Sequence, residues 1–154
     1  MKKFDFRLQS VLQLKSQLED NAKNSLARAT RELENQKAFL EELNSINNGS
    51  MNSLTSEVDE GISIYRIKVY NSYLSHLKNK ITNQKENVNI AERDVDINRE
   101  SLIKAMQERK IIEKLKEKKY QEYIKEQNKA EQLVIDELNS FKFKDGSGEE
   151  NARD

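Results

Sequence analysis

Apolar residues recur along the first third of the chain at steps of three and four residues. This spacing places them on one face of an amphipathic α-helix. The series, with its polar members, is Leu8, Val11, Lys15, Leu18, Ala22, Leu26, Ala29, Leu33, Gln36, Leu40 and Leu43. Two consecutive four-residue steps, from Leu18 to Leu26, form a stutter that would locally unwind a left-handed supercoil. We expect a first helix over about residues 5–56, with Asp5 as its N-cap.

The helical pattern weakens over residues 44–50, which are mostly asparagine, serine and glycine. These residues favour turns, so the first helix either ends near Asn47 or continues to about Ser56. We favour continuation, because the helical spacing resumes afterwards and no proline forces a stop. A clearer break comes at Gly61, which can adopt the left-handed conformation of a helix C-cap. Ser63 suits the N-cap of the next helix, so the hinge is expected at about residues 57–63.

A stricter seven-residue repeat runs through the second half of the chain. One series of seam positions is Leu74, Ile81, Val88, Val95 and Leu102, and the other is Tyr70, Leu77, Gln84, Ala91, Asn98, Ala105 and Ile112. Such a repeat, sustained over six heptads, is typical of a left-handed coiled coil. Arg109 breaks the apolar seam, but further apolar residues predict a second helix over about residues 64–142. Residues 144–154 have no apolar period, and we expect a disordered tail there.

Folding back at Gly61 gives an all-α fold in which two long helices form an antiparallel coiled-coil hairpin over residues 1–143. The second helix, at ~80 residues, is longer than the first, at ~50 residues, so it should overhang. If pairing runs outward from the turn, Met1 lies beside about residue 117. Apolar residues over 118–141 would then have no intramolecular partner, which indicates a binding surface or self-association.

Composition supports long helices over a compact globule, because 35% of the residues are apolar and 35% are charged. The absence of proline argues against disorder. The absence of cysteine excludes disulfides and thiolate metal sites. No apolar run reaches the ~18 residues that span a bilayer, and the N-terminus lacks a signal-like apolar stretch. We therefore expect a soluble, intracellular protein without direct membrane insertion.

Charge is balanced overall but unevenly distributed. The formal net charge is zero, which argues against nucleic acid as a partner. Residues 31–61 hold seven acidic and two basic residues, whereas residues 104–129 hold nine basic and five acidic residues. We expect a negative turn end and a positive end where the chain termini pair, which could orient a partner.

The sequence contains no arrangement typical of catalysis. His76 is the single histidine, and no glycine-rich phosphate loop accompanies it. A solvated or seam-flanking role is the simpler interpretation of this residue. We expect no enzymatic activity, no metal and no cofactor. The phenylalanines near the two chain ends, Phe4, Phe6, Phe141 and Phe143, either cap the seam or anchor a partner, and the sequence leaves both interpretations open.

Three stretches resemble the flagellar export protein FliJ family. They are the opening Phe4-Asp5-Phe6-Arg7-Leu8-Gln9-Ser10-Val11-Leu12, the positions Glu19, Ala22 and Leu26-Ala27, and the hinge region from Gly61-Ile62-Ser63 through Tyr70-Asn71-Ser72-Tyr73-Leu74 to Leu77. The similarity covers about residues 1–143. It implies a soluble component of the bacterial flagellar type III protein export apparatus, shaped as a coiled-coil stalk that hydrolyses nothing itself.

The resemblance also implies partners and a location. Such a stalk binds the pore of the hexameric export ATPase, the cytoplasmic domain of the membrane export gate and the export chaperones. It would be cytoplasmic and peripheral at the cytoplasmic face of the inner membrane at the flagellar base, and monomeric in isolation. We place the ATPase contact on Phe4, Phe6, Arg7, Leu8, Val11 and Leu12, with Lys116, Lys118, Lys119, Tyr120 and Tyr123 opposite, and the gate contact around Gln17 to Arg28. The alternatives are the stalk of a virulence type III secretion system and a generic coiled-coil scaffold.

Overall fold

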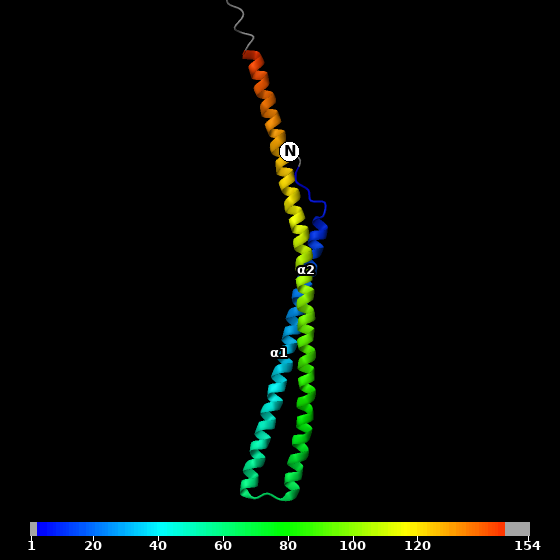
Figure 1. The fold of residues 1–154 in the computed structure, drawn as a ribbon, viewed down its shortest axis with the longest axis vertical. Helices are drawn as coiled ribbons and strands as arrows, with labels where there is room; N and C mark the ends of the chain where they lie inside the picture. Colours follow the sequence, from blue (N-terminus) through cyan, green and yellow to red (C-terminus); the bar gives the residue numbers. More distant parts are fainter. Residues whose placement is uncertain (1–2, 147–154) are drawn as a thin grey trace, which may run out of the picture. The chain divides into compact units, whose positions relative to one another are not determined.

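Two long α-helices account for almost all of the described structure (Figure 1). The computed structural model describes residues 3–146, and side chains over 3–144. Helix α1 spans Gln9–Glu60 and helix α2 spans Ile64–Gly146, with residues 61–63 between them. The predicted fold class, two long helices packed against each other, is confirmed. Part of the predicted tail, residues 144–146, belongs to α2, and the rest of it lies outside the described residues.

Helix α1 begins at Gln9, four residues later than expected, and Asp5 is not its N-cap. The first helical backbone bond runs from Leu12 N–H to the carbonyl of Leu8, at 3.0 Å. Residues 3–6 are not helical. Phe4, Phe6 and Leu8 alternate with polar residues, and this period of two suits an extended chain with one apolar side. The same residues would spread around a helix.

The weak stretch at residues 44–50 remains helical, as expected, and α1 continues to Glu60. The predicted turn chemistry is also present. Gly61 has φ 92°, and its N–H donates to the carbonyl of Val58 at 3.2 Å. Ser63 caps α2, since its Oγ accepts a hydrogen bond from Arg66 N–H at 3.3 Å. Both caps satisfy backbone groups that a helix end leaves without intrahelical partners.

The described residues form two compact units, one of residues 16–107 and one that combines residues 3–15 with 108–146. In the first unit, α1 and α2 pack side by side and antiparallel (Figure 1). Leu43 packs with Leu77, Ile81 and the half-buried Leu40, and the side chains of Val88, Ala91 and Val95 are buried further along α2. The predicted seam of α2 is confirmed, because each of its positions is buried or half-buried.

The predicted seam of α1 is wrong at one position. Leu18 is 43% exposed, whereas Glu19 is 4% exposed and pairs with Lys23 at 2.9 Å. With Glu19 in place of Leu18, the seam has steps of four, three and four residues. These steps lead from Lys15 through Glu19 and Ala22 to Leu26, as in a strict heptad. The two consecutive four-residue steps then fall from Val11 through Lys15 to Glu19, so the stutter lies seven residues earlier than expected. A regular seven-residue repeat keeps one face of α1 against the partner helix, and this regularity outweighs the hydrophobicity of a single leucine.

Polar contacts also cross the seam of this unit. Gln84 Nε2 donates to Gln36 Oε1 at 2.6 Å and to the Gln36 carbonyl at 2.9 Å. Nearer the turn, Glu57 accepts a hydrogen bond from the Tyr70 hydroxyl at 2.9 Å and pairs with Arg66 at 3.0 Å. Hydrogen bonds satisfy these buried or half-buried polar groups, so they cost less to bury and help to fix the register of the two helices.

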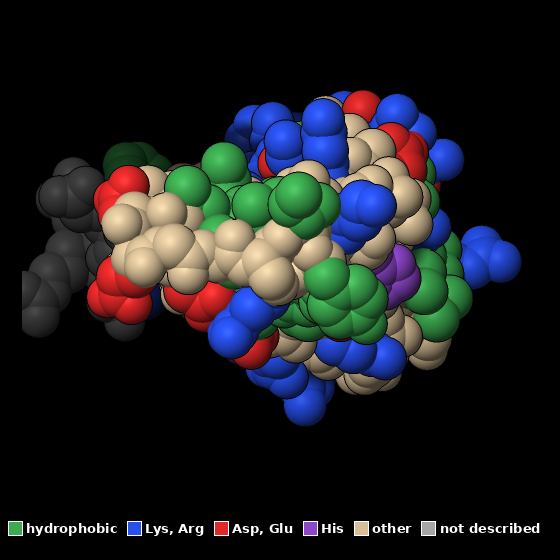
Figure 2. All heavy atoms as spheres, turned by 90° about the horizontal axis from the view of Figure 1, so that it is seen from below, with side chains coloured by type: hydrophobic (Ala, Val, Ile, Leu, Met, Phe, Trp, Pro, Cys, Tyr) green, Lys and Arg blue, Asp and Glu red, His purple; other side chains and the backbone are tan. Residues whose placement is uncertain are grey.

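The turn end is less acidic than expected. The acidic residues of 31–61 lie on α1, but α2 returns alongside with five basic and two acidic residues over 62–92. This balance of +3 offsets most of the −5 on α1. Figure 2, which looks onto this end, shows many lysine and arginine side chains among the acidic ones. The expectation considered one helix alone, and the pairing of the two helices changes the local charge.

Neither described helix has a stretch long and apolar enough to cross a membrane.

Candidate functional site

The unit that contains the N-terminus holds the residues predicted to bind a partner. Here the start of α1 and the residues before it pack against α2. We call residues 3–15 together with 108–126 the paired end. Two polar contacts fix it: Lys15 Nζ lies 2.8 Å from Glu108 Oε2, and Lys116 Nζ donates to Gln9 Oε1 at 2.9 Å.

Three aromatic side chains form a cluster at the paired end. The Phe4 ring lies edge-on to Tyr120, with ring centroids 5.2 Å apart and planes at 78°. It is also 5.6 Å from Tyr123, and the two tyrosine rings are 6.3 Å apart. Edge-to-face and offset arrangements of this kind stabilise aromatic pairs beyond the burial of their area. The cluster attaches the non-helical N-terminal residues to α2.

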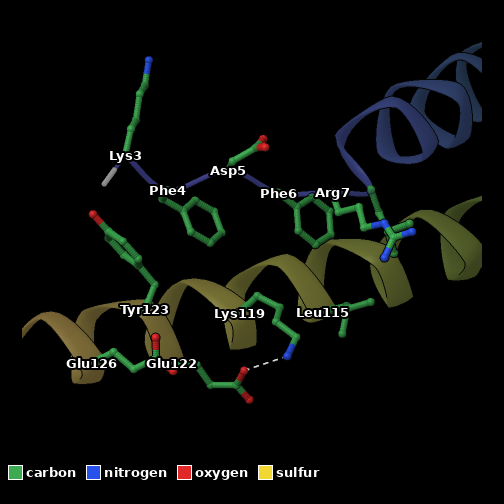
Figure 3. Close-up of a pocket in the computed structure, with 11 residues that line it drawn as sticks. Lys3, Phe4, Asp5, Phe6, Arg7, Leu115, Lys119, Glu122, Tyr123 and Glu126 are labelled. Atoms are coloured by element: carbon green, nitrogen blue, oxygen red, sulfur yellow. Dashed lines mark hydrogen bonds and ion pairs between the residues drawn. The ribbon is translucent and has the colours of Figure 1, made fainter. Parts of the chain in front are cut away.

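Phe6 is the second aromatic attachment, and it is more deeply buried, at 8% exposure. Figure 3 shows the rings of Phe4 and Phe6 directed toward α2, while Lys3 and Asp5 point away from it. This alternation is the geometry of an extended chain. The local sequence therefore arranges two anchors on one side and charged groups on the other.

These residues and α2 line a pocket of about 790 Å³ that is open to solvent (Figure 3). Its lining combines aromatic and aliphatic groups with charges of both signs. The lining residues are Lys3, Phe4, Asp5, Phe6, Arg7, Leu8, Leu115, Lys119, Glu122, Tyr123 and Glu126. An extended chain does not interdigitate with a helix as a second helix would, and space remains beside it.

The electrostatic character of the paired end is basic. Residues 108–126 carry seven basic and five acidic residues, and residues 3–15 add three basic residues against one acidic residue. Lys119 Nζ lies 2.8 Å from Glu122 Oε2. This hydrogen bond raises the pKa of Lys119 and lowers the pKa of Glu122, and the attraction of the two charges acts in the same directions. Both groups therefore stay charged around neutral pH.

The structure places the predicted partner-binding residues at this one end, in three environments. Phe4, Phe6 and Tyr123 are buried or half-buried in the attachment. Leu8, Val11 and Leu12 are half-buried at the start of α1, and Lys116 is half-buried against Gln9. Arg7, Lys118, Lys119 and Tyr120 are exposed. The exposed set is the part of the prediction that is accessible to a partner without rearrangement.

Several residues of the paired end were missed from the sequence. Leu115 lies under the attachment, Gln9 and Glu108 make its polar contacts, and Glu122 and Glu126 line the cavity. Leu115 is one of the further apolar residues after Arg109 from which the second helix was predicted. The alternation of Phe4, Phe6 and Leu8 could have indicated an extended segment, and with it the need for an apolar surface on α2.

The uncovered part of α2 begins later than expected. Phe4 contacts Tyr120 and Tyr123, where helical pairing would have ended near residue 117. An extended chain advances ~3.3 Å per residue, against ~1.5 Å in a helix, so the N-terminal residues reach further along α2. Residues 128–144 are exposed, including Leu133, Val134, Ile135, Leu138, Phe141 and Phe143.

The described residues hold no group of three or more acidic, histidine or cysteine side chains that could bind a metal ion. His76 is exposed at the surface of the first unit (Figure 2). The features that stand out at the paired end are an aromatic attachment, a basic surface and an adjoining apolar helix face. These features suit the binding of another macromolecule.

Comparison with known proteins gives two matches. The model of the family described as flagellar FliJ protein matches residues 3–148. A solved structure described as that of a proposed YscO homolog from Chlamydia trachomatis has a TM-score of 0.74 and 24% sequence identity. The alignment covers 96% of this chain and 100% of that one, and at this identity it shows a shared fold. No curated protein matches.

Proposed function

Because the chain belongs to the FliJ family, we propose that it is a coiled-coil stalk of a bacterial flagellar type III protein export apparatus. In this role the paired end binds the pore of the hexameric export ATPase. Other surfaces connect the ATPase to the export gate and to export chaperones. The stalk contributes binding and carries out no reaction.

The observation that carries the ATPase assignment is the basic surface of the paired end. Arg7, Lys118 and Lys119 are exposed there, next to the half-exposed ring of Tyr120. A pore that receives such an end needs acidic or polar groups on its wall. Opposite charges across an interface speed association and orient the partners.

The structure changes how Phe4 and Phe6 enter this proposal. Their rings pack against α2, so they act by holding the N-terminal residues in place. Direct contacts to the ATPase come from Arg7, Lys118, Lys119 and Tyr120.

The test is to add the purified chain to the cognate export ATPase and to measure both its oligomerisation and its hydrolysis rate. We expect a shift toward hexamers and faster hydrolysis. An ATPase that changes neither property would contradict the stalk role. The effect should weaken as salt rises, because screening shortens the reach of exposed charges to ~8 Å at physiological ionic strength.

A charge-reversal pair locates the contact. Arg7→Glu with Lys118→Glu should lower ATPase affinity by about tenfold or more, because like charges would then face each other. Lys78→Glu with Lys80→Glu makes the same change of charge on exposed residues of the other unit. This control should leave affinity unchanged, and an equal loss in both variants would remove the assignment to the paired end.

The gate contact is proposed for the exposed face of α1 around Gln17 to Arg28. Leu18, an apolar residue at 43% exposure, lies on this face. Leu18→Ala should weaken binding to the cytoplasmic domain of the gate and leave ATPase activation intact. The export chaperones and a peripheral position at the membrane belong to the same proposal.

A virulence type III secretion stalk is the second candidate. The fold similarity to the proposed YscO homolog is the observation that favours it. The neighbouring genes distinguish the two systems, because flagellar components and virulence components are encoded with their own partners. Loss of motility on deletion of the gene would support the flagellar role.

A further inference from the structure

One face of α2, in the unit that contains the N-terminus, carries a row of lysines that we call the lysine face. Its members are Lys110, Lys114, Lys118, Lys125 and Lys129, and all five are exposed. At ~100° per residue, these positions fall within an arc of ~100° of the helix surface, and the row is ~29 Å long. The half-buried residues Ile112, Lys116 and Tyr123 lie on the opposite side of the helix. The lysine face therefore points away from the residues that pack on α2.

The lysine face contains no acidic residue. The other positions of the arc between residues 110 and 129 are Ile111, Gln121 and Asn128. The glutamates of this stretch lie on the two borders of the arc, and they are Glu113, Glu117, Glu122 and Glu126. The arc itself therefore presents positive charge alone.

Within residues 3–144, none of the five lysines has an ion pair or a hydrogen bond. The cations nearer the seam differ, because Arg109 pairs with Glu113 at 2.6 Å and Lys119 pairs with Glu122 at 2.8 Å. In addition, three pairs of neighbouring lysines in the row are four residues apart, a spacing at which like charges destabilise a helix. The row therefore lowers the stability of α2, and an anionic partner would remove this cost.

The proposed ATPase contact includes one member of this row, Lys118. Its other residues, Arg7, Lys119 and Tyr120, lie outside the arc. The remaining four lysines extend over ~29 Å of helix, so their partner needs a long and diffuse anionic surface.

A phospholipid surface suits the composition of the lysine face better than an acidic protein or a nucleic acid does. The arc has no arginine, whose planar fork matches carboxylates and nucleic-acid phosphates in pairs of hydrogen bonds. It has no aromatic ring on which the bases of a single strand could stack. Lysines are flexible point charges, which a layer of mobile headgroups accommodates without a matching shape. Ile111, at 65% exposure on the same arc, adds an apolar side chain that the headgroup region can take up.

We propose that the lysine face binds the surface of an anionic phospholipid bilayer. Residues 110–129 of α2 lie parallel to the membrane, with the lysine ammonium groups among the anionic headgroups and Ile111 between them. Each lysine close to such a surface strengthens binding by about fivefold, and salt weakens the attraction. The contact goes beyond the proposed function, because it gives the chain a direct attachment to lipid.

Co-sedimentation of the full chain with lipid vesicles measures this binding. The vesicles contain phosphatidylglycerol and phosphatidylcholine in equal parts, or phosphatidylcholine alone. We expect the wild type to bind the anionic vesicles more tightly than the neutral ones by about tenfold or more, and to dissociate as salt rises. A smaller preference, or no binding to the anionic vesicles, would overturn the proposal.

Lys114→Gln with Lys125→Gln and Lys129→Gln tests the lysine face itself. Glutamine has nearly the helix propensity of lysine, so α2 should remain intact. The affinity for anionic vesicles should fall by about tenfold or more. Thermal unfolding should occur at the same or a higher temperature, because pairs of like charges are removed. A smaller loss of affinity, or a lower unfolding temperature that makes these lysines structural, would overturn the proposal.

Lys78→Gln with Lys80→Gln and Lys85→Gln is the matched control. It removes three exposed lysines of the same helix and changes the net charge equally. These lysines do not share a face, since Lys80 lies ~160° around the helix from Lys78. The control should bind anionic vesicles as the wild type does. An equal loss in both triple variants would mean that net charge governs the binding, which contradicts a role for the lysine face.

Poly-L-glutamate and a DNA duplex separate the other sources of negative charge. The wild type should bind both more weakly than the anionic vesicles, and tighter binding of either one would overturn the choice of lipid. The triple variant of the lysine face keeps Arg7 and Lys118, so it should still activate the export ATPase. Failure of vesicle binding would therefore leave the stalk role standing, and failure of ATPase activation would leave the lipid contact standing.

Discussion

Gln84 shows how a single polar residue can stabilise a seam. It is 4% exposed, and its amide donates to both the side chain and the backbone carbonyl of Gln36. Replacing it with leucine would leave two acceptors without their donor. We predict that Gln84→Leu costs about 1–2 kcal/mol of unfolding free energy in urea denaturation.

Asn89→Leu is the control for this substitution, because Asn89 is exposed on the same helix. It should change stability by less than about 0.5 kcal/mol. Gln36→Leu combined with Gln84→Leu should recover part of the loss, since the side-chain acceptor is then removed together with its donor and only the Gln36 backbone carbonyl loses that bond. If Gln84→Leu alone were as stable as the wild type, the role assigned to the Gln84–Gln36 hydrogen bonds would be refuted.

Tyr70 provides a residue-scale prediction about pH. The hydrogen bond to Glu57 is the main cause that raises the pKa of Tyr70 above its ordinary value of 10.0, and partial burial adds to it. A raised folded-state pKa means that this contribution to stability is present below pH 10.0 and is lost as pH rises through the raised value.

Two variants at the turn should move the Tyr70 pKa in opposite directions, as measured by NMR titration. Glu57→Gln should lower it toward 10.0, because the acceptor loses its charge. Arg66→Gln should raise it further, because Arg66 favours the ionised phenol. If the pKa of Tyr70 shifted in the same direction in both variants, the hydrogen bond to the Glu57 carboxylate would not be what controls it.

At the scale of elements, two glycines, one inside α1 and one at the turn, have opposite roles. Gly49 is inside α1, and a Cβ atom built there meets nothing within 4 Å. Gly61 has φ 92°, a conformation that L-amino acids with side chains rarely adopt. The same substitution at the two sites should therefore have effects of opposite sign.

We predict that Gly49→Ala stabilises the chain by about 1 kcal/mol and that Gly61→Ala destabilises it by about 1 kcal/mol or more. Thermal unfolding followed by circular dichroism measures both. Gly49 lies in the stretch where a helix end was considered from the sequence. Destabilisation by Gly49→Ala would mean that α1 is not a regular helix at this point.

Helix α1 also shows that the pattern of apolar residues can predict the wrong seam residue. By side-chain hydrophobicity alone, Leu18 is the better seam residue, and Glu19 belongs on the surface. The heptad that runs from Lys15 through Glu19 to Ala22 places the carboxylate inside and the leucine outside. The strict heptad from Lys15 onward overrides the preference of one position.

At the scale of the whole molecule, each unit already pairs α1, or the residues before it, with α2. This leaves an apolar stripe of α2 exposed over residues 128–141, which includes Val134, Leu138 and Phe141. We predict that the chain is a monomer in sedimentation equilibrium at micromolar concentration, because a stable interface needs more buried area than one such stripe offers.

Val134→Asp with Leu138→Asp is the companion variant for this measurement, and it should sediment as the wild type does. A dimer in the wild type that the variant abolishes would identify the stripe as a self-association surface. It would favour the generic scaffold over the monomeric stalk.

The sequence alone determined the features that depend on local physics. Heptad spacing determined that there are two helices and which face of α2 is buried. Gly61 and Ser63 determined the turn, because positive φ and N-capping depend on the residue type at one place. The alternation of Phe4, Phe6 and Leu8 also carried a local signal for an extended segment, although it became clear only beside α2.

Tertiary structure decided the features that require two segments to meet. It placed Glu19 in the seam of α1 and left Leu18 exposed, because packing against α2 sets the register of α1. It offset the acidic charge of α1 with the basic start of α2. It also placed residues 3–8 beside Leu115, Tyr120 and Tyr123, where an extended chain reaches further than a helix would. Each outcome depends on distances between residues far apart in sequence, and these distances are defined only once the helices pack.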